Sequence, residues 1–269
     1  MTANGNVAPS TALTGAATTL NGPAAQVHDT AGNLYVADFN TSSVLVFAPG
    51  TTGNVAPTRT INGAATMINA PEGIGVDSAG NIYLGSRNGG YITVFAAGAS
   101  GNAAPLRTIS GAATTLGSPQ QISVDGAGNI YVANPGLTSS VLFFAAGASG
   151  NVAPTRTLSG AATLITDPLG VAIDSAGKIF VADDASGILV FAPAASGNTA
   201  PIAQITGAAT TISFPEGMAV DANDNIYVSD CTDQAVLVFA AGSNGNVAPV
   251  ATIKGANTTL TCPLKLEVR

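Results

Sequence analysis

One phrase of five residues, Gly-Asn-x-Ala-Pro, recurs along the whole chain at a nearly constant interval. It begins at Gly5, Gly53, Gly101, Gly150, Gly197 and Gly245, and successive copies are 48, 48, 49, 47 and 48 residues apart. A fixed period of this length is the signature of a repeat fold, in which each unit buries its apolar face only against its neighbours. The chain is therefore built from copies of one unit of about 48 residues.

Each unit predicts four short β-strands. In the second complete unit they cover residues 73–77, 81–84, 91–95 and 105–109, with β-branched and aromatic residues in the strands and Gly, Pro, Asn and Ser between them. No segment shows the apolar period of 3.6 residues that an amphipathic helix requires. Four strands in 40–50 residues is typical of one blade of a β-propeller. We expect an all-β fold and one propeller domain over residues 1–269.

The two ends of the chain do not hold complete units. In strand order the chain begins with one fourth strand (residues 7–13), continues through five complete units and ends with one extra first strand (residues 264–268). We expect six blade positions, with one incomplete blade formed by the two termini; five blades is the alternative. Because an incomplete blade leaves strand edges open, it predicts possible self-association.

The residues that repeat in every unit have a structural interpretation. An aromatic residue on the second strand and a Phe at the end of the third strand are expected to pack between blades; an aromatic platform for carbohydrate is the alternative. An Asp closes each first strand, where its short side chain can accept backbone N–H groups of the following turn. These Asp residues are Asp29, Asp77, Asp125, Asp174 and Asp221.

The run Pro-Glu-Gly-Ile-Gly-Val-Asp-Ser-Ala-Gly-Asn-Ile-Tyr, residues 71–83, resembles the signature of NHL-repeat propellers. That superfamily is also similar to gluconolactonase/regucalcin-like enzymes and to streptogramin lyases. The resemblance implies the fold and leaves the activity open, since this fold carries many unrelated functions.

The composition narrows the possible partners. Charged residues make up 9% of the chain, against roughly 25% in ordinary soluble domains, and the net charge is −7. The eight basic residues are never adjacent, so we expect no nucleic-acid partner. No apolar run approaches the roughly 18 residues of a transmembrane helix, and the first residues lack the features of a signal peptide. A low-charge surface rich in Thr and Asn favours a secreted, periplasmic or cell-surface protein of a bacterium.

The two cysteines lie at positions that are not cysteine in any other unit. Cys231 follows a second strand and Cys262 precedes a first strand, so alternation of strand direction places both on the same side. We expect a Cys231–Cys262 disulfide, which agrees with an oxidising compartment; two unrelated buried thiols are the alternative.

A second set of polar residues varies between units. Second strands end in Asp38, Asn134, Asp183 and Asp230, and first strands begin near Glu72 and Glu216. Alternation sends these positions to one face, which we expect at the mouth of a central channel. Carboxylate oxygens there could hold Ca²⁺ or another divalent cation, although no cofactor is required. Resemblance to the gluconolactonases, which place a Glu, an Asn and an Asp around a metal, matches these residue types; a merely solvated acidic rim is the alternative.

His28 is the only histidine and therefore the only candidate proton shuttle. Streptogramin-lyase chemistry depends on histidine, and no second His, Ser-His-Asp set or Cys-His pair can be assembled around His28. A packed substitution on the inner strand is the alternative.

These observations favour a non-catalytic binding or scaffolding propeller of the cell envelope or extracellular space, with a protein or carbohydrate partner. The alternative is a metal-dependent hydrolase or lyase of gluconolactonase-like type, with its site at the channel mouth.

Overall fold

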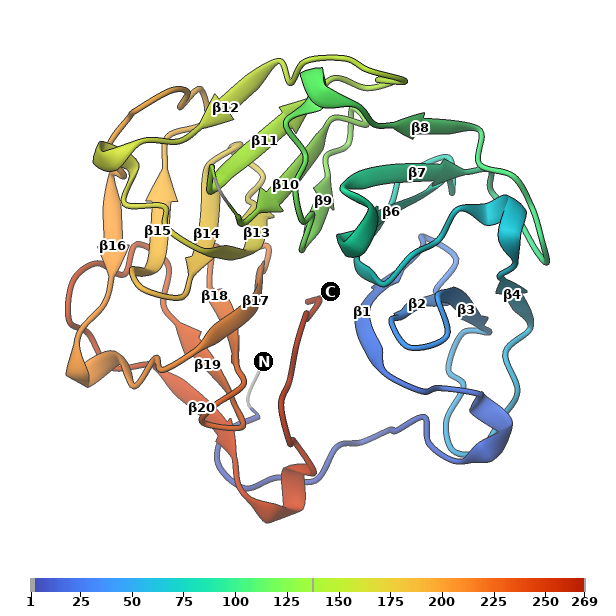
Figure 1. The fold of residues 1–269 in the computed structure, drawn as a ribbon. Helices are drawn as coiled ribbons and strands as arrows, with labels where there is room; N and C mark the ends of the chain where they lie inside the picture. Colours follow the sequence, from blue (N-terminus) through green and yellow to red (C-terminus); the bar gives the residue numbers. More distant parts are fainter. Residues whose placement is uncertain (1–2, 137, 269) are drawn as a thin grey trace. The chain divides into compact units, whose positions relative to one another are not determined.

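The computed structural model describes residues 3–136 and 138–268, and these residues form five antiparallel sheets of four strands (Figure 1). In each sheet the strands lie side by side in chain order. The first sheet consists of β1 (Pro23–His28), β2 (Leu34–Asp38), β3 (Ser43–Phe47) and β4 (Arg59–Ile61), and the second of β5 (Pro71–Val76), β6 (Ile82–Ser86), β7 (Tyr91–Phe95) and β8 (Arg107–Ile109). The third consists of β9 (Ile122–Val124), β10 (Ile130–Asn134), β11 (Ser140–Phe144) and β12 (Arg156–Leu158). The fourth consists of β13 (Pro168–Ile173), β14 (Ile179–Asp183), β15 (Gly187–Phe191) and β16 (Ala203–Ile205), and the fifth of β17 (Pro215–Val220), β18 (Ile226–Asp230), β19 (Ala235–Phe239) and β20 (Ala251–Lys254).

The helices of the described residues are single 3₁₀ turns. Six of them follow the same Gly-Ala-x-Thr pattern: η1 (Ala16–Thr18), η2 (Ala64–Thr66), η4 (Ala112–Thr114), η5 (Ala161–Thr163), η6 (Ala208–Thr210) and η7 (Ala256–Thr258). The seventh, η3 (Arg87–Gly89), lies between β6 and β7. In the described part of the chain, no helix has the length and apolar character needed to cross a membrane.

The described residues form two compact units. One comprises the described residues of Met1–Pro9, Ala133–Leu142 and Arg156–Arg269, and the other comprises Ser10–Val132 and Phe143–Thr155. The prediction of one domain over residues 1–269 stays a prediction, and each unit is described by itself below.

Apolar side chains on successive sheets of a unit pack together. Tyr35 of the first sheet shares a cluster with Ile74 and Leu84 of the second. In the other unit, Phe180 of the fourth sheet packs with Met218 and Val228 of the fifth. The Phe that ends each third strand is almost completely buried: Phe47, Phe95, Phe144, Phe191 and Phe239. The prediction that the periodic aromatic residues form the core is confirmed.

The Asp at the end of each first strand organises the next turn. In the second sheet, Asp77 Oδ1 accepts the backbone N–H groups of Ala79 and Asn81, at 3.0 and 2.8 Å. Its Oδ2 accepts the Asn81 amide and the Tyr83 hydroxyl, at 2.8 and 3.0 Å. Equivalent bonds recur at Asp29, Asp125 and Asp221. The predicted turn role of these residues is therefore confirmed.

The Gly-Asn-x-Ala-Pro motif links the loop between third and fourth strands to an earlier part of the chain. Asn102 Oδ1 accepts the backbone N–H of Ala65 in η2 at 2.7 Å. Beside it, Gly101 forms a parallel bridge with Ile61 at the end of β4. We call this pair of contacts the Asn staple. It recurs in the other copies of the motif, through Asn54, Asn151, Asn198 and Asn246. Asn6 makes the same contact with η7, which lies later in the chain.

The staple explains the glycine that precedes each of the six Gly-Ala-x-Thr turns. Gly63 has φ +116°, and a Cβ atom there would lie 2.5 Å from Asn102 Oδ1. Only glycine both adopts this conformation without strain and leaves room for the Asn side chain.

The expected sixth blade is wrong, and the five-blade alternative is confirmed. Among the described residues, neither segment 7–13 nor segment 264–268 is a β-strand. Gly5 bridges to Ile253, and Leu13 bridges to Gly53. Leu264 and Lys265 approach Gly217, where a Cβ atom would lie 2.6 Å from Leu264 O. Each terminal segment thus makes only isolated contacts with a complete sheet, so no reduced blade forms among the described residues.

Candidate functional site

The aspartates that end second strands are buried and hydrogen-bonded. Asp183 is completely buried at the end of β14. Its Oδ2 accepts the backbone N–H groups of Thr166 and Asp167 at 2.7 and 2.9 Å, and its Oδ1 accepts the Thr166 hydroxyl at 2.8 Å. The backbone N–H of Ser186 also donates to Oδ1, at 3.1 Å. One carboxylate thus ties the loop that enters the first strand to the turn that follows the second.

Asp230 and Asp38 have the same role. Asp230 Oδ2 accepts the N–H groups of Ser213 and Phe214 at 2.6 and 3.0 Å, and its Oδ1 accepts that of Asp233 at 2.9 Å. Asp38 accepts the N–H of Asn21 at 2.7 Å. It also accepts the N–H and the hydroxyl of Thr41, at 3.1 and 2.7 Å. These carboxylates stabilise loops.

Asn134 stands at the same place in the third sheet and is buried at 2% exposure. Its side-chain amide donates to Ser140 Oγ at 3.3 Å. An Asn amide can donate as well as accept, so this position tolerates Asn where other sheets carry Asp.

Glu72 is paired with an arginine. Arg87 Nη1 lies 2.6 Å from Glu72 Oε1, and the Glu72 side chain is 15% exposed. Arg87 belongs to η3, which is present only between β6 and β7 in the described residues. The pair fixes the start of β5 to this extra turn.

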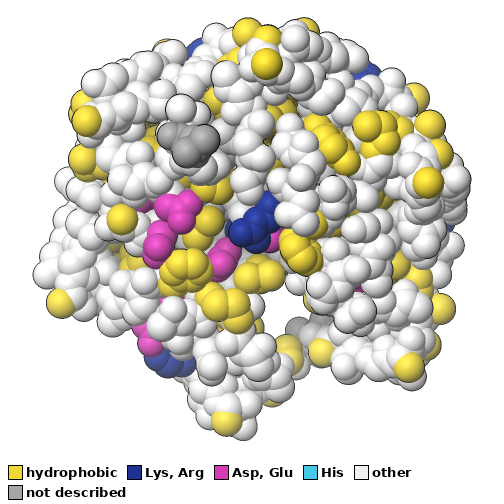
Figure 2. All heavy atoms as spheres, viewed as in Figure 1, with side chains coloured by type: hydrophobic (Ala, Val, Ile, Leu, Met, Phe, Trp, Pro, Cys, Tyr) yellow, Lys and Arg dark blue, Asp and Glu magenta, His cyan; other side chains and the backbone are white. Residues whose placement is uncertain are grey.

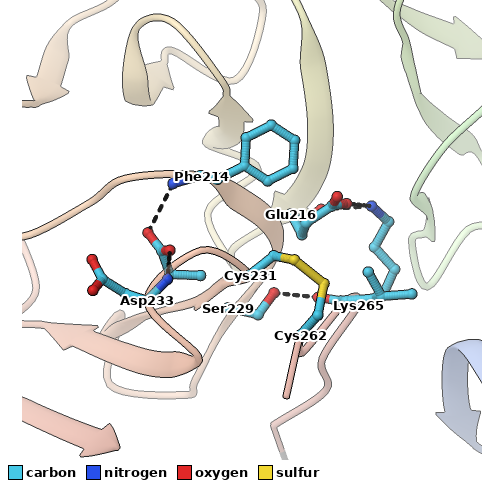
Figure 3. The surroundings of a disulfide bond; sticks show 9 residues. Phe214, Glu216, Ser229, Cys231, Asp233, Cys262 and Lys265 are labelled. Carbon is cyan, nitrogen blue, oxygen red and sulfur yellow. Dashed lines mark hydrogen bonds and ion pairs between the residues drawn. A yellow bond between two sulfur atoms is a disulfide. The ribbon is translucent and has the colours of Figure 1, made fainter. Parts of the chain in front are cut away.

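Glu216 is paired with a lysine from the end of the chain (Figure 3). Lys265 Nζ donates to Glu216 Oε2 at 3.1 Å and to the Glu216 backbone oxygen at 2.6 Å. The Lys265 side chain is only 5% exposed. A lysine this deeply buried requires a partner charge, and Glu216 supplies it.

Lys265 was missed as a site residue by sequence reasoning. It stands where the other units have Ala25, Gly73, Gln121, Gly170 and Gly217. This departure from small or neutral residues was the signal that could have identified it.

The predicted disulfide between Cys231 and Cys262 is present (Figure 3). It joins residues 31 positions apart. Cys262 precedes Leu264 by two positions. Ser229 Oγ donates to Leu264 O close by. Disulfide, ion pair and hydrogen bond together fix segment 262–265 on the fifth sheet.

His28 ends β1 and is half-buried. It lies in the wall of a cavity of about 300 Å³, together with Leu34 and Phe47. No second histidine exists in the sequence to share proton transfer with it.

The structure brings together some of the predicted site residues. Asp184, next to Asp183, is exposed at the turn after β14. Loss of water around it, followed by the negative charges of Asp183 and Glu216, raises the pKa of the Asp184 carboxyl. Asp183 and Glu216 are therefore electrostatic neighbours in one unit. Asp38 and Glu72 belong to the other unit, and a shared channel mouth stays a prediction.

The carboxylates predicted to hold a cation are engaged with other groups of the protein. In the described ranges 3–136 and 138–268, no three His, Cys, Asp or Glu side chains are grouped so that they could hold a metal ion. Asp38, Asp183 and Asp230 already accept backbone N–H groups, and Lys265 supplies the positive charge beside Glu216.

Comparison with known proteins identifies the class of fold first. A chain from the crystal structure of a nidogen/laminin complex superposes with a TM-score of 0.65, covering 90% of this chain and 82% of that chain at 16% identity. Its likeness shows the fold alone. The five four-stranded sheets are the blades of an all-β propeller.

A comparison with family models adds a match within the sequence. The family model for the NHL repeat matches residues 213–239, which extend from the loop before β17 to the end of β19. The predicted resemblance to NHL-repeat propellers is confirmed. No curated protein sequence matches the chain.

Proposed function

We propose that this propeller is a non-catalytic binding or scaffolding module of the bacterial cell envelope or extracellular space, with a protein or glycan partner. The observation that carries this function is the engagement of the buried strand-end carboxylates. Asp183 holds two loops through four hydrogen bonds. A general acid or base needs an oxygen that is accessible to substrate.

The surface supports a binding role. In the view of Figure 2, polar uncharged and apolar atoms cover most of the face, and the charged side chains are few. Hydroxyl, amide and apolar groups suit contacts with a protein or a glycan. The nidogen/laminin chain that shares the fold comes from a complex between proteins, which supports a protein partner.

The disulfide supports a location outside the reducing cytoplasm. Structural disulfides persist mainly in oxidising compartments, and Cys231 and Cys262 are the only cysteines in the chain. Alkylation of free thiols before lysis of the producing cells, followed by mass spectrometry, tests this location. We expect both cysteines to resist alkylation; full alkylation would contradict the proposal.

Catalytic activity is tested with lactone and ester substrates, with and without added Ca²⁺. Elemental analysis and a calorimetric Ca²⁺ titration accompany the assay. We expect no turnover and no stoichiometric divalent ion. The double variant Glu72→Gln/Glu216→Gln should leave the metal content unchanged.

A measurable turnover that this double variant abolishes, while the circular dichroism spectrum is retained, would overturn the proposal. It would favour the metal-dependent hydrolase or lyase instead. Stoichiometric Ca²⁺ that is lost in the double variant would do the same.

A further inference from the structure

A cavity lies beside His28 in the first sheet. At the equivalent position in two later sheets, an arginine side chain of the protein contacts the loop. The cavity has a volume of about 300 Å³, and Thr11 and Thr51 line it together with His28. Thr51 belongs to the loop between β3 and β4. All of these residues belong to the same compact unit.

The repeat shows what fills the equivalent position one unit later. A shift of 48 residues converts Thr11 into Arg59 and Thr51 into Ala99. Arg59 Nη1 donates to the Ala99 backbone oxygen at 2.9 Å. The Arg59 guanidinium also lies 5.7 Å from the centre of the Tyr35 ring.

The fourth sheet repeats this arrangement with another arginine. Arg156 Nη1 donates to the backbone oxygens of Pro193 and Ala195, at 2.9 and 3.2 Å. The loops of the second and the fourth sheet therefore both accept a guanidinium from a preceding fourth strand.

The first sheet has the same loop without the arginine. The backbone N–H of Thr51 donates to Ala48 O at 3.2 Å, as that of Ala99 donates to Ala96 O at 3.1 Å. The two turns have the same hydrogen bond, so we infer that the Thr51 carbonyl has the same orientation as the Ala99 carbonyl. Thr11 is too short to reach it, and the space remains as a cavity.

The other walls suit an arginine side chain. Leu13, Leu34 and Phe47 are apolar and can cover its methylene groups. His28 replaces the aliphatic residues Val76, Val124, Ile173 and Val220 of the other units. The net charge of −7 favours a cationic ligand at long range.

We propose that this cavity binds a guanidinium group, presented as an arginine side chain by a partner protein. The inference rests on the proposed binding function and names the chemistry of one contact. A guanidinium donates several N–H groups in a fixed plane, which matches the carbonyls of this loop better than a lysine ammonium does.

The test uses the single histidine as a reporter. Nα-acetyl-arginine methylamide is titrated into the protein while the ring resonances of His28 are followed by NMR. We expect a saturable shift with a dissociation constant on the order of 1 mM, since one small ligand provides few contacts. The lysine analogue, at the same ionic strength, should give less than a tenth of that shift.

Two variants make the test specific. Thr11→Arg places the chain's own guanidinium in the cavity, as Arg59 does one unit later, and should abolish the shift. Thr11→Ser keeps the cavity open and should retain it. Thr11 is exposed, so neither variant threatens folding.

The source of the guanidinium is distinguished by a third ligand. A short peptide with a central arginine should bind more tightly than the single amino acid derivative if a protein supplies the group. Equal affinity would indicate a free small molecule and overturn the protein source.

The absence of a saturable shift, an equal shift with lysine, or a shift that persists in Thr11→Arg would overturn the site. None of these outcomes depends on turnover or metal content, so the proposed function can fail or stand separately.

Discussion

At the scale of single residues, the polar groups of each unit are used mainly to hold turns. Asp77 accepts four hydrogen bonds within six residues of itself. In the fourth sheet Lys178 and Phe180 replace the usual Asn and Tyr. There the Lys178 ammonium lies 3.2 Å from Asp174 Oδ2 and supplies the missing partner.

These hydrogen bonds predict an acid dependence of stability. Burial, the largest single effect, raises the pKa of Asp77, but the bonds from Asn81, Tyr83 and Ala79 together lower it below its ordinary value. Because the pKa of Asp77 is lower in the folded than in the unfolded protein, its ionised carboxylate stabilises the fold. This contribution is complete at pH values above the pKa of an unfolded Asp, about 3.9. This stability is lost as the pH falls through the folded value.

We therefore expect the free energy of unfolding to fall below about pH 4, and Asp77→Asn to reduce the slope of that fall. Urea denaturation between pH 5 and pH 2 measures it. Asp184→Asn is the control: the pKa of Asp184 is raised, so its removal should steepen the fall. Identical slopes for Asp77→Asn and the unmodified protein would contradict the explanation.

Thr93 is a residue whose replacement should stabilise the protein. Its side chain is completely buried, and its hydroxyl has no hydrogen-bond partner. The other units have Leu45, Leu142, Leu189 and Leu237 at this position. We expect Thr93→Val, which keeps the shape, to raise the free energy of unfolding by about 1 kcal/mol.

The control for Thr93 is a threonine whose hydroxyl is used. Thr66 Oγ1 donates to Gly63 O at 2.7 Å and accepts the Ile68 N–H at 3.2 Å. Thr66→Val should lower the free energy of unfolding by about 1–2 kcal/mol. The same sign for both variants in urea denaturation would be incompatible with these assignments.

The distance between partners decides which residue roles could be predicted from the sequence. Asp77 was assigned correctly because its donors follow it by two to six positions. The partners of Asp183 could not be predicted in this way, because its donors Thr166 and Asp167 lie 17 and 16 residues earlier. Variation between Asp, Asn and Ser at this position had suggested selection for a ligand. In the structure Asp183 and Asn134 bond to groups of neighbouring loops and turns, and a ligand role for these positions stays a prediction.

At the scale of elements, the Asn staple connects each copy of the Gly-Asn-x-Ala-Pro motif to a 3₁₀ turn that is distant in the sequence. The sequence showed the repeated motif but could not show its partner, since Asn102 and Ala65 are 37 residues apart. The separation is largest for the first copy of the motif, since Asn6 and its partner Asn257 are 251 residues apart. In the structure, Gly5 and Asn6 act as a staple for Ile253 and η7.

We expect Asn102→Ala to lower the free energy of unfolding by about 1–2 kcal/mol, because it leaves the Ala65 N–H without its acceptor. Asn62→Ala is the matched control, since the exposed Asn62 side chain lies in the same region. Thermal and urea denaturation compare the two. If Asn62→Ala is as costly as Asn102→Ala, the staple has no special role.

The disulfide acts at the same scale, on the segment that follows β20. Closing a loop of 31 residues stabilises a protein by roughly 3–4 kcal/mol in the chain-entropy model. We expect Cys231→Ser/Cys262→Ser to lose about that amount and to show faster hydrogen exchange in residues 262–268. Unchanged exchange there would show that Lys265 and Ser229 hold the segment without the covalent bond.

At the scale of the whole molecule, the repeat predicts most of the fold and little of the function. The four-stranded sheets and their aromatic core follow from the period, because every unit has the same side chains to bury. The number of blades could not be decided from the sequence, because it depends on whether two terminal segments pair with each other. The roles of Glu72 and Glu216 depend on Arg87 and Lys265, which do not repeat.

The central claim for the whole molecule is that its strand-end carboxylates hold the propeller together and do not bind a catalytic metal. The most direct measurement compares Asp183→Ala with Asp184→Ala by urea denaturation, once in EDTA and once in Ca²⁺. We expect Asp183→Ala to lose about 2–4 kcal/mol in both solutions, since buried N–H groups lose their acceptor, while Asp184→Ala changes little. Equal stability of the two variants in EDTA, with a loss for Asp183→Ala that appears only in Ca²⁺, would contradict the claim.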